Sequence, residues 1–91
     1  MAAEIRDNTA DHRFELDAEG GMSLMYYRLD PGMITLLHTE VPPALGGHGL
    51  GSALVRGVLD LVRARGLKVV PKCPFVAAYM GRHPEYNDLL H

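Results

Sequence analysis

The sequence predicts a mixed α/β fold. An antiparallel meander of three strands is followed by a strand–helix–strand unit, which adds one parallel strand, and by a short C-terminal helix. In the first half of the chain, apolar residues alternate with polar ones, which is the two-residue period of strands. From Leu50 onward they recur every three to four residues, as on one face of a helix. The 91 residues suffice for one domain.

The three expected strands cover residues 13–17, about 22–29 and about 33–41. Phe14 and Leu16 alternate with charged residues in the first of them. Glycines follow Glu19, and the second and third strands are separated by Asp-Pro-Gly, a strong turn sequence. Because the turns between successive strands are short, we expect neighbouring strands to pair antiparallel.

The second half of the chain predicts a helix of about 16 residues from Leu50, ended by Gly66 as the residue after the C-cap. A short strand over residues 67–70 follows, then a helix over about 74–80 and a final turn in the tail. A helix between two strands predicts that these strands are parallel. Residues 1–11 are polar, and we expect a partly frayed N-terminal segment before a domain at 12–91.

Composition excludes several classes of function. A net charge of −2 and a pI near 6.2 do not favour nucleic-acid binding. The chain has neither an apolar run long enough to span a membrane nor a signal-peptide pattern, so we expect a cytoplasmic protein with no membrane partner. Its single cysteine, Cys73, cannot form an intramolecular disulfide, and the five histidines lack metal-ligand spacing, so we expect no metal.

A glycine-rich stretch, LGGHGLG, joins the third expected strand to the first helix. Backbone N–H groups at the start of a helix favour an anion such as phosphate. The stretch lacks the lysine of a Walker loop, and its glycine spacing does not fit a dinucleotide-binding fold. The residues by themselves also allow a tight connection without any ligand.

The segment from Val41 to Gly51 resembles the acetyl-CoA-binding motif of the GNAT acetyltransferase superfamily, V-x-P-x-x-[RQ]-G-x-G-[IL]-[GA]. The matching residues are Val41, Pro43, Gly47, Gly49, Leu50 and Gly51. Gly46 departs from the motif, because the family usually has Arg or Gln there. The segments 69–76 and 83–86 resemble the small, single-domain YjdJ-type branch of the superfamily, and the likeness spans about residues 12–91.

The resemblance implies a GNAT-like fold and acetyl-CoA as the co-substrate. It implies that the pantetheine arm pairs with the strand edge near Thr39 and that the pyrophosphate lies on the glycine loop. The cofactor-binding residues that it indicates are Thr39, Val41, Gly46, Gly47, His48, Gly49, Leu50, Gly51 and Ser52.

Four residues are candidates for catalysis. Cys73 stands at a strand exit before a helix N-terminus, which lowers the pKa of a thiol. The resemblance places it at the acetyl group, as a nucleophile or as a wall of the site; a buried, inert cysteine is the other interpretation. His38 and Glu40 are candidate bases, although His38 also suits a hydrogen-bonded sheet histidine. Tyr79 is the weaker candidate acid, since Met80 occupies the family's tyrosine position.

The sequence therefore predicts a minimal acetyl-CoA-dependent N-acetyltransferase with an unidentified amine acceptor, which is a protein, a peptide or a small molecule. The expected first strand begins near residue 12, so we expect neither the N-terminal helices of larger family members nor a closed acceptor site. A non-catalytic CoA- or acyl-CoA-binding module and a small interaction protein are the alternatives. The sequence leaves a homo-oligomer or a protein partner open.

Overall fold

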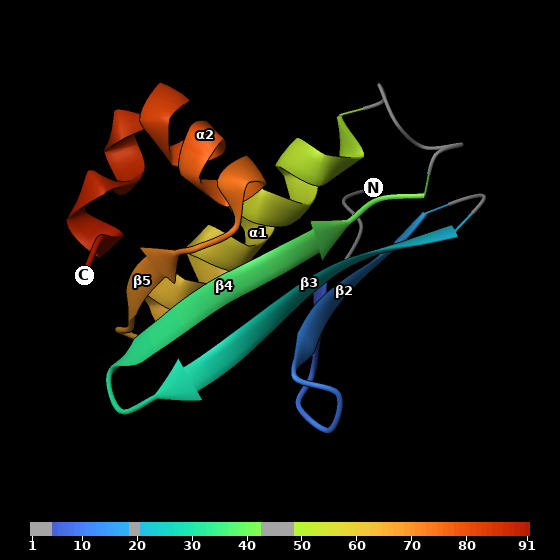
Figure 1. Cartoon of the computed structure of the whole chain (residues 1–91), viewed down its shortest axis with the longest axis horizontal. Coiled ribbons are helices and arrows are strands. Elements are labelled where there is room, and N and C mark those ends of the chain that lie inside the picture. The colour runs from blue at the N-terminus through green and yellow to red at the C-terminus, as the bar shows by residue number, and fades with distance from the viewer. Residues whose placement is uncertain (1–4, 19–20, 43–48) are drawn as a thin grey trace.

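The computed structural model describes residues 5–18, 21–42 and 49–91 and contains one five-stranded sheet in the order β1-β2-β3-β4-β5. The strands are β1 (Ile5–Asn8), β2 (Arg13–Ala18), β3 (Gly21–Asp30), β4 (Met33–Glu40) and β5 (Lys68–Pro71). Every neighbouring pair is antiparallel except β4 and β5, which are parallel. The mixed sheet and its parallel addition are therefore confirmed (Figure 1).

Strand β1 corrects the expectation of a frayed segment before residue 12. It pairs antiparallel with β2, and its side chains are anchored by other elements. Ile5 packs on Gly57 of the first helix, and Asp7 accepts hydrogen bonds from Tyr27 at 2.7 Å and Arg65 at 2.7 Å. These anchors are far away in the sequence, so the polar composition of the segment could not indicate them.

Glu15 on β2 connects the two N-terminal strands. Its carboxylate accepts hydrogen bonds from Asn8, Arg13 and Arg6 at 3.0, 2.8 and 3.1 Å. Together these donors lower the pKa of Glu15 to about 2, since they stabilise its charged form. The side chain is thus charged at neutral pH although it is largely buried.

The β3–β4 hairpin turns at Pro31-Gly32, with Gly32 in the left-handed region at φ 72°. The register shifts by one residue beside Tyr26 and Tyr27, which leaves Leu37 on β4 without a β3 partner. Strand β5 pairs with β4 only from Met33 to Leu36. Strand β5 ends at Pro71, opposite Leu36, and β4 continues past it toward Glu40, as Figure 1 shows.

Helix α1 (Leu50–Ala64) contacts all five strands. Its C-terminus is the predicted one, because Gly66 adopts φ 70° and the N–H groups of Gly66 and Leu67 donate to Arg63 and Val62. This is the Schellman arrangement that ends many helices. The buried core between helix and sheet includes Phe14, Met25, Ile34, Leu36, Leu54, Val55, Val58, Leu59 and Val62.

Helix α2 (Pro74–Arg82) runs two residues further than predicted and lies against β4, β5 and α1. The predicted final turn is a 3-10 helix, η2 (Pro84–Leu89). Tyr86 of η2 donates a hydrogen bond to Asp60 of α1 at 2.9 Å, and Arg63 binds Asp88 at 2.7 Å. Within the described ranges, no helix has the length and apolar character needed to cross a membrane.

Candidate active site

The thiol of Cys73 lies beside β4, just past the end of β5 at Pro71. The backbone N–H of Cys73 donates to the carbonyl of Leu36, the last β4 residue that pairs with β5, at 2.9 Å. Its sulfur lies 3.3 Å from Oγ1 of Thr39, further along β4. The structure thus brings together two predicted site residues, Cys73 as a catalytic candidate and Thr39 as a cofactor-binding one.

Cys73 is the N-cap of α2 and is only 3% exposed. Burial raises the pKa of the thiol, because a charged sulfur loses its hydration. The Thr39 hydroxyl and backbone hydrogen bonds from Val76 and Phe75 act in the opposite direction and prevail, so that the thiol pKa lies below its ordinary value. This environment favours the thiolate, which is the nucleophilic form of cysteine.

The start of α1 provides the second part of the site. Gly49 is its N-cap and adopts φ 72°, a left-handed conformation that strains other residues, and it offers no side chain to cap the helix. Gly51 is buried in the first turn, and Ser52 beside it is partly exposed. Val41 follows directly after the end of β4 and is partly buried. The other predicted loop residues, Gly46, Gly47 and His48, lie outside the described residues.

His38 and Glu40 are solvent-accessible, with side chains 63% and 54% exposed. The two ionisable groups are 3.9 Å apart, and the His38 ring stacks on Tyr26 with centroids at 6.3 Å. Since successive strand residues point to opposite faces, both lie on the face away from Thr39. They are available to a molecule that approaches this open face.

Tyr79 lies inside the C-terminal packing of the molecule. It is buried, its ring stacks on His83 with centroids at 4.0 Å, and Tyr86 lies 6.2 Å away. These contacts join α2 to the segment that follows it. Its assignment as an acid stays a prediction.

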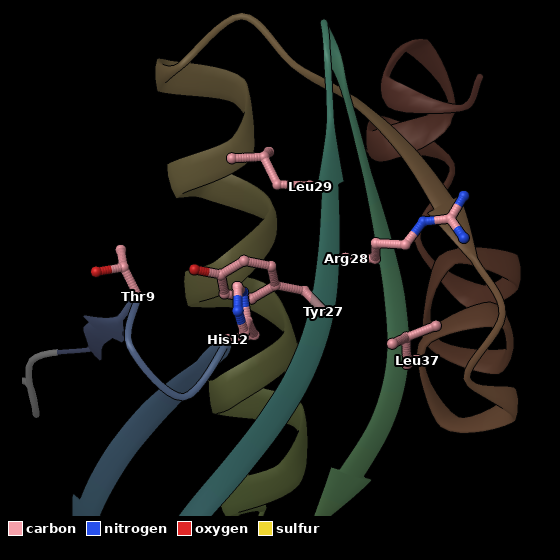
Figure 2. Close-up of a pocket in the computed structure, with 6 residues that line it drawn as sticks. All are labelled: Thr9, His12, Tyr27, Arg28, Leu29 and Leu37. Carbon is pink, nitrogen blue, oxygen red and sulfur yellow. The ribbon is translucent and has the colours of Figure 1, made fainter.

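A shallow hollow of about 600 Å³ lies elsewhere and contains none of the candidate residues. Figure 2 shows Thr9, His12 and Tyr27 on one side of β3, with Arg28 and Leu37 on the other. It forms because β2 begins at Arg13, while β3 continues to Asp30 beside the turn that holds His12 at φ 52°. Among the residues that the structure describes, no cluster of three or more His, Cys, Asp or Glu side chains could hold a metal ion.

Phe75 belongs to the segment that carries the family resemblance, but the sequence assigned it no role. Its ring lies over Gly51, linking the starts of α2 and α1. The contact of Thr39 with Cys73 was equally hidden, because the two residues are 34 positions apart and Thr39 was expected only as part of a strand edge. The local signal for Phe75 was its place in the segment 69–76 that resembles the family, which does not indicate where the ring points.

Comparison with known proteins points to one family. The family described as GCN5-related N-acetyl-transferase matches residues 13–89. Protein NATD1 is 33% identical over 68 residues in Gallus gallus and over 61 residues in Homo sapiens, covering 75% and 67% of this chain. The matches span 62% and 54% of those relatives, so the chain covers little more than half of their length.

A solved structure shares nearly the whole fold. The solution NMR structure of a GCN5-like putative N-acetyltransferase from Staphylococcus aureus superposes with a TM-score of 0.74 at 27% identity. The match covers 99% of this chain and 89% of that one. The arrangement of β4, α1, β5 and α2 around Cys73 therefore occurs within a fold already known in nature.

Proposed function

Because the chain belongs to the GCN5-related N-acetyltransferase family, we propose that it transfers an acetyl group from acetyl-CoA to an amine, with Cys73 in the reaction. The observation that carries this proposal is the position of the Cys73 thiol, just past the end of β5 and 3.3 Å from Thr39 on the part of β4 that has no β5 partner. A thioester that lies along this part of β4 meets a thiol whose pKa is lowered.

Two features of the chain suit two parts of acetyl-CoA, its pyrophosphate and its pantetheine arm. The N-terminal turn of α1, without a side-chain cap, offers backbone N–H groups and the positive end of the helix dipole to the pyrophosphate. The β4 segment from Leu37 to Glu40 has no β5 partner, and the Cys73 thiol meets it at Thr39, so the remaining backbone groups of this edge suit the amide groups of the pantetheine arm. Neither feature requires the Arg or Gln that Gly46 replaces.

The transfer proceeds in two steps. The Cys73 thiolate attacks the thioester carbonyl, its new S–C bond forms, and the C–S bond to CoA breaks, so that CoA leaves as a thiolate and takes up a proton. The amine then attacks the acetyl-cysteine, an N–C bond forms, and the Cys73 thiolate is released. The proton that the amine loses passes to solvent, because His38 and Glu40, the predicted bases, lie on the face of β4 away from Thr39 and Cys73.

The first test combines binding with mass spectrometry. Acetyl-CoA at about 100 times its dissociation constant should stabilise the protein by about 2.7 kcal/mol in thermal unfolding. After incubation with acetyl-CoA alone, the intact wild-type protein should carry one acetyl group, and Cys73→Ala should carry none while still binding. Addition of a panel of peptide and small amines should then remove the group from the wild type.

The outcomes separate the alternatives. No thermal shift with acetyl-CoA or CoA contradicts the proposed function altogether. Binding without transfer to any amine favours a CoA-binding module. Transfer by Cys73→Ala at the wild-type rate contradicts the covalent step and favours direct attack by the amine.

A further inference from the structure

Phe75 is a large apolar residue that the fold leaves 42% exposed. It belongs to the first turn of α2, directly after Pro74 and two residues after Cys73. Most of the large apolar side chains that the structure describes are buried in the core, so an exposed ring beside the candidate active site needs an explanation.

The ring of Phe75 reaches across to the start of α1. A methyl group built on Gly51 would lie 2.8 Å from Cζ of the ring, which is closer than real side-chain contacts. The ring can occupy this position because Gly51 has no side chain. The chain keeps an aromatic ring against the helix end that is the seat proposed for the pyrophosphate.

The backbone of the same residue lies at the other end of the site. Backbone hydrogen bonding from Phe75 and Val76 helps to lower the pKa of the Cys73 thiol. The main chain of Phe75 is thus at the thiol and its ring is at the first turn of α1. The side chain spans the interval between the proposed thioester and pyrophosphate positions.

We propose that Phe75 is a specificity-determining residue, whose exposed ring forms the apolar wall for the pantetheine arm of acetyl-CoA. This inference rests on the proposed function. The arm consists of methylene groups and two amides, and such groups pack favourably on an aromatic face. A ligand that has the pantetheine arm covers the exposed part of the ring and removes this apolar surface from water. A nucleotide of the same charge without the arm leaves the ring exposed. The ring therefore favours acyl-CoA ligands over such nucleotides.

The experiment compares a ligand with the arm and one without it. Calorimetric titrations measure the binding of acetyl-CoA and of adenosine 3′,5′-bisphosphate, the nucleotide half of CoA. Phe75→Ala should weaken acetyl-CoA binding about tenfold and leave the binding of adenosine 3′,5′-bisphosphate unchanged. The tenfold loss corresponds to roughly half of the free energy gained when an aromatic side chain is fully buried. Phe75→Leu should retain most of the acetyl-CoA affinity. Leu90→Ala is the matched control, since Leu90 is also 42% exposed, and it should change neither affinity.

A second measurement follows the environment of the ring by fluorescence and does not require a variant with reduced affinity. The chain has no tryptophan, so Phe75→Trp introduces a single reporter. Its fluorescence should shift to shorter wavelength with acetyl-CoA and stay constant with adenosine bisphosphate. Thermal melts of each variant show whether it is folded.

The possible failures are distinguishable. If wild type binds acetyl-CoA and Phe75→Ala binds it equally well, the role of Phe75 is wrong while the proposed function stands. Equal losses for both ligands would also overturn the role, because the ring would then act on the helix end. If wild type binds neither ligand, the proposed function fails, and this inference fails with it.

Discussion

The pair of Thr39 and Cys73 illustrates how one hydroxyl can change the chemistry of a buried thiol. Each side chain by itself is ordinary: a half-buried threonine on a strand and a buried cysteine at a helix start. At 3.3 Å, the Thr39 hydroxyl can donate to the sulfur, and this stabilises the thiolate more than the neutral thiol. The reactivity expected of Cys73 thus depends on a residue from another element.

Replacing Thr39 should therefore change the thiol pKa. Thr39→Val keeps the shape and removes the hydroxyl, so the pKa of Cys73 should rise, whereas Thr39→Ser should restore the wild-type value. Ultraviolet absorbance of the thiolate against pH measures it directly, since Cys73 is the only cysteine. Cys73→Ser gives the background. An unchanged pKa in Thr39→Val would show that the backbone hydrogen bonds, and not the hydroxyl, set the ionisation.

At the scale of elements, strand β1 depends on a missing side chain in α1. A Cβ atom on Gly57 would overlap Cδ1 of Ile5, so the glycine is the recess into which the strand docks. Glycine inside a helix costs about 0.5–1 kcal/mol relative to alanine. Gly57 therefore lowers the stability of the helix itself but allows β1 to join the sheet as an edge strand. Hydrogen bonds from Arg6 and Asn8 to Glu15 hold β1 in register with β2.

Two glycine-to-alanine substitutions separate these effects. A methyl group on Gly81 in α2 would point into open space, so Gly81→Ala should stabilise the protein by about 0.5–1 kcal/mol in urea denaturation. Gly57→Ala should instead destabilise it and raise the hydrogen-exchange rates of the β1 amides, because Ile5 is displaced. In an Ile5→Ala background, Gly57→Ala should be stabilising. A stabilising Gly57→Ala in the wild type would contradict the docking argument.

For the molecule as a whole, the C-terminal segment ties the separate parts together. Tyr86 donates to Asp60 of α1, and the N–H of His91 donates to Val69 of β5 at 3.0 Å. Burial and the neighbouring Asp60 raise the pKa of Tyr86 to about 12, so the hydroxyl keeps its proton at neutral pH and acts as a donor. The segment holds α2, and with it Cys73, against the rest of the fold.

Removing that hydroxyl should weaken global stability. Tyr86→Phe should lower the free energy of unfolding by about 1 kcal/mol, the net contribution of one such hydrogen bond. Tyr26→Phe is the matched control, since its hydroxyl only accepts a long 3.3 Å bond from Arg13 on the open sheet face, and its effect should be under about 0.5 kcal/mol. Equal losses in chemical denaturation would show that the Asp60 contact adds no more stability than the long Arg13 contact of Tyr26.

Several features of the fold follow from neighbouring residues alone. The apolar spacing from Leu50 defined α1, Gly66 fixed its end, and Asp30-Pro31-Gly32 fixed the β3–β4 turn. The helix between β4 and β5 required those strands to be parallel. These predictions succeed because local backbone preferences and side-chain periodicity act over a few residues.

Other features emerged only when the elements packed together. Strand β1 formed from a segment whose composition suggested fraying, Thr39 met Cys73, and the ring of Phe75 settled over Gly51. Each joins residues from different elements, and which residues meet depends on how those elements pack. The amino-acid order was enough to define the main elements after residue 12, their succession and the family to which the glycine motif belongs. Packing selected the side chains that surround the thiol, because that requires the whole core to be in place.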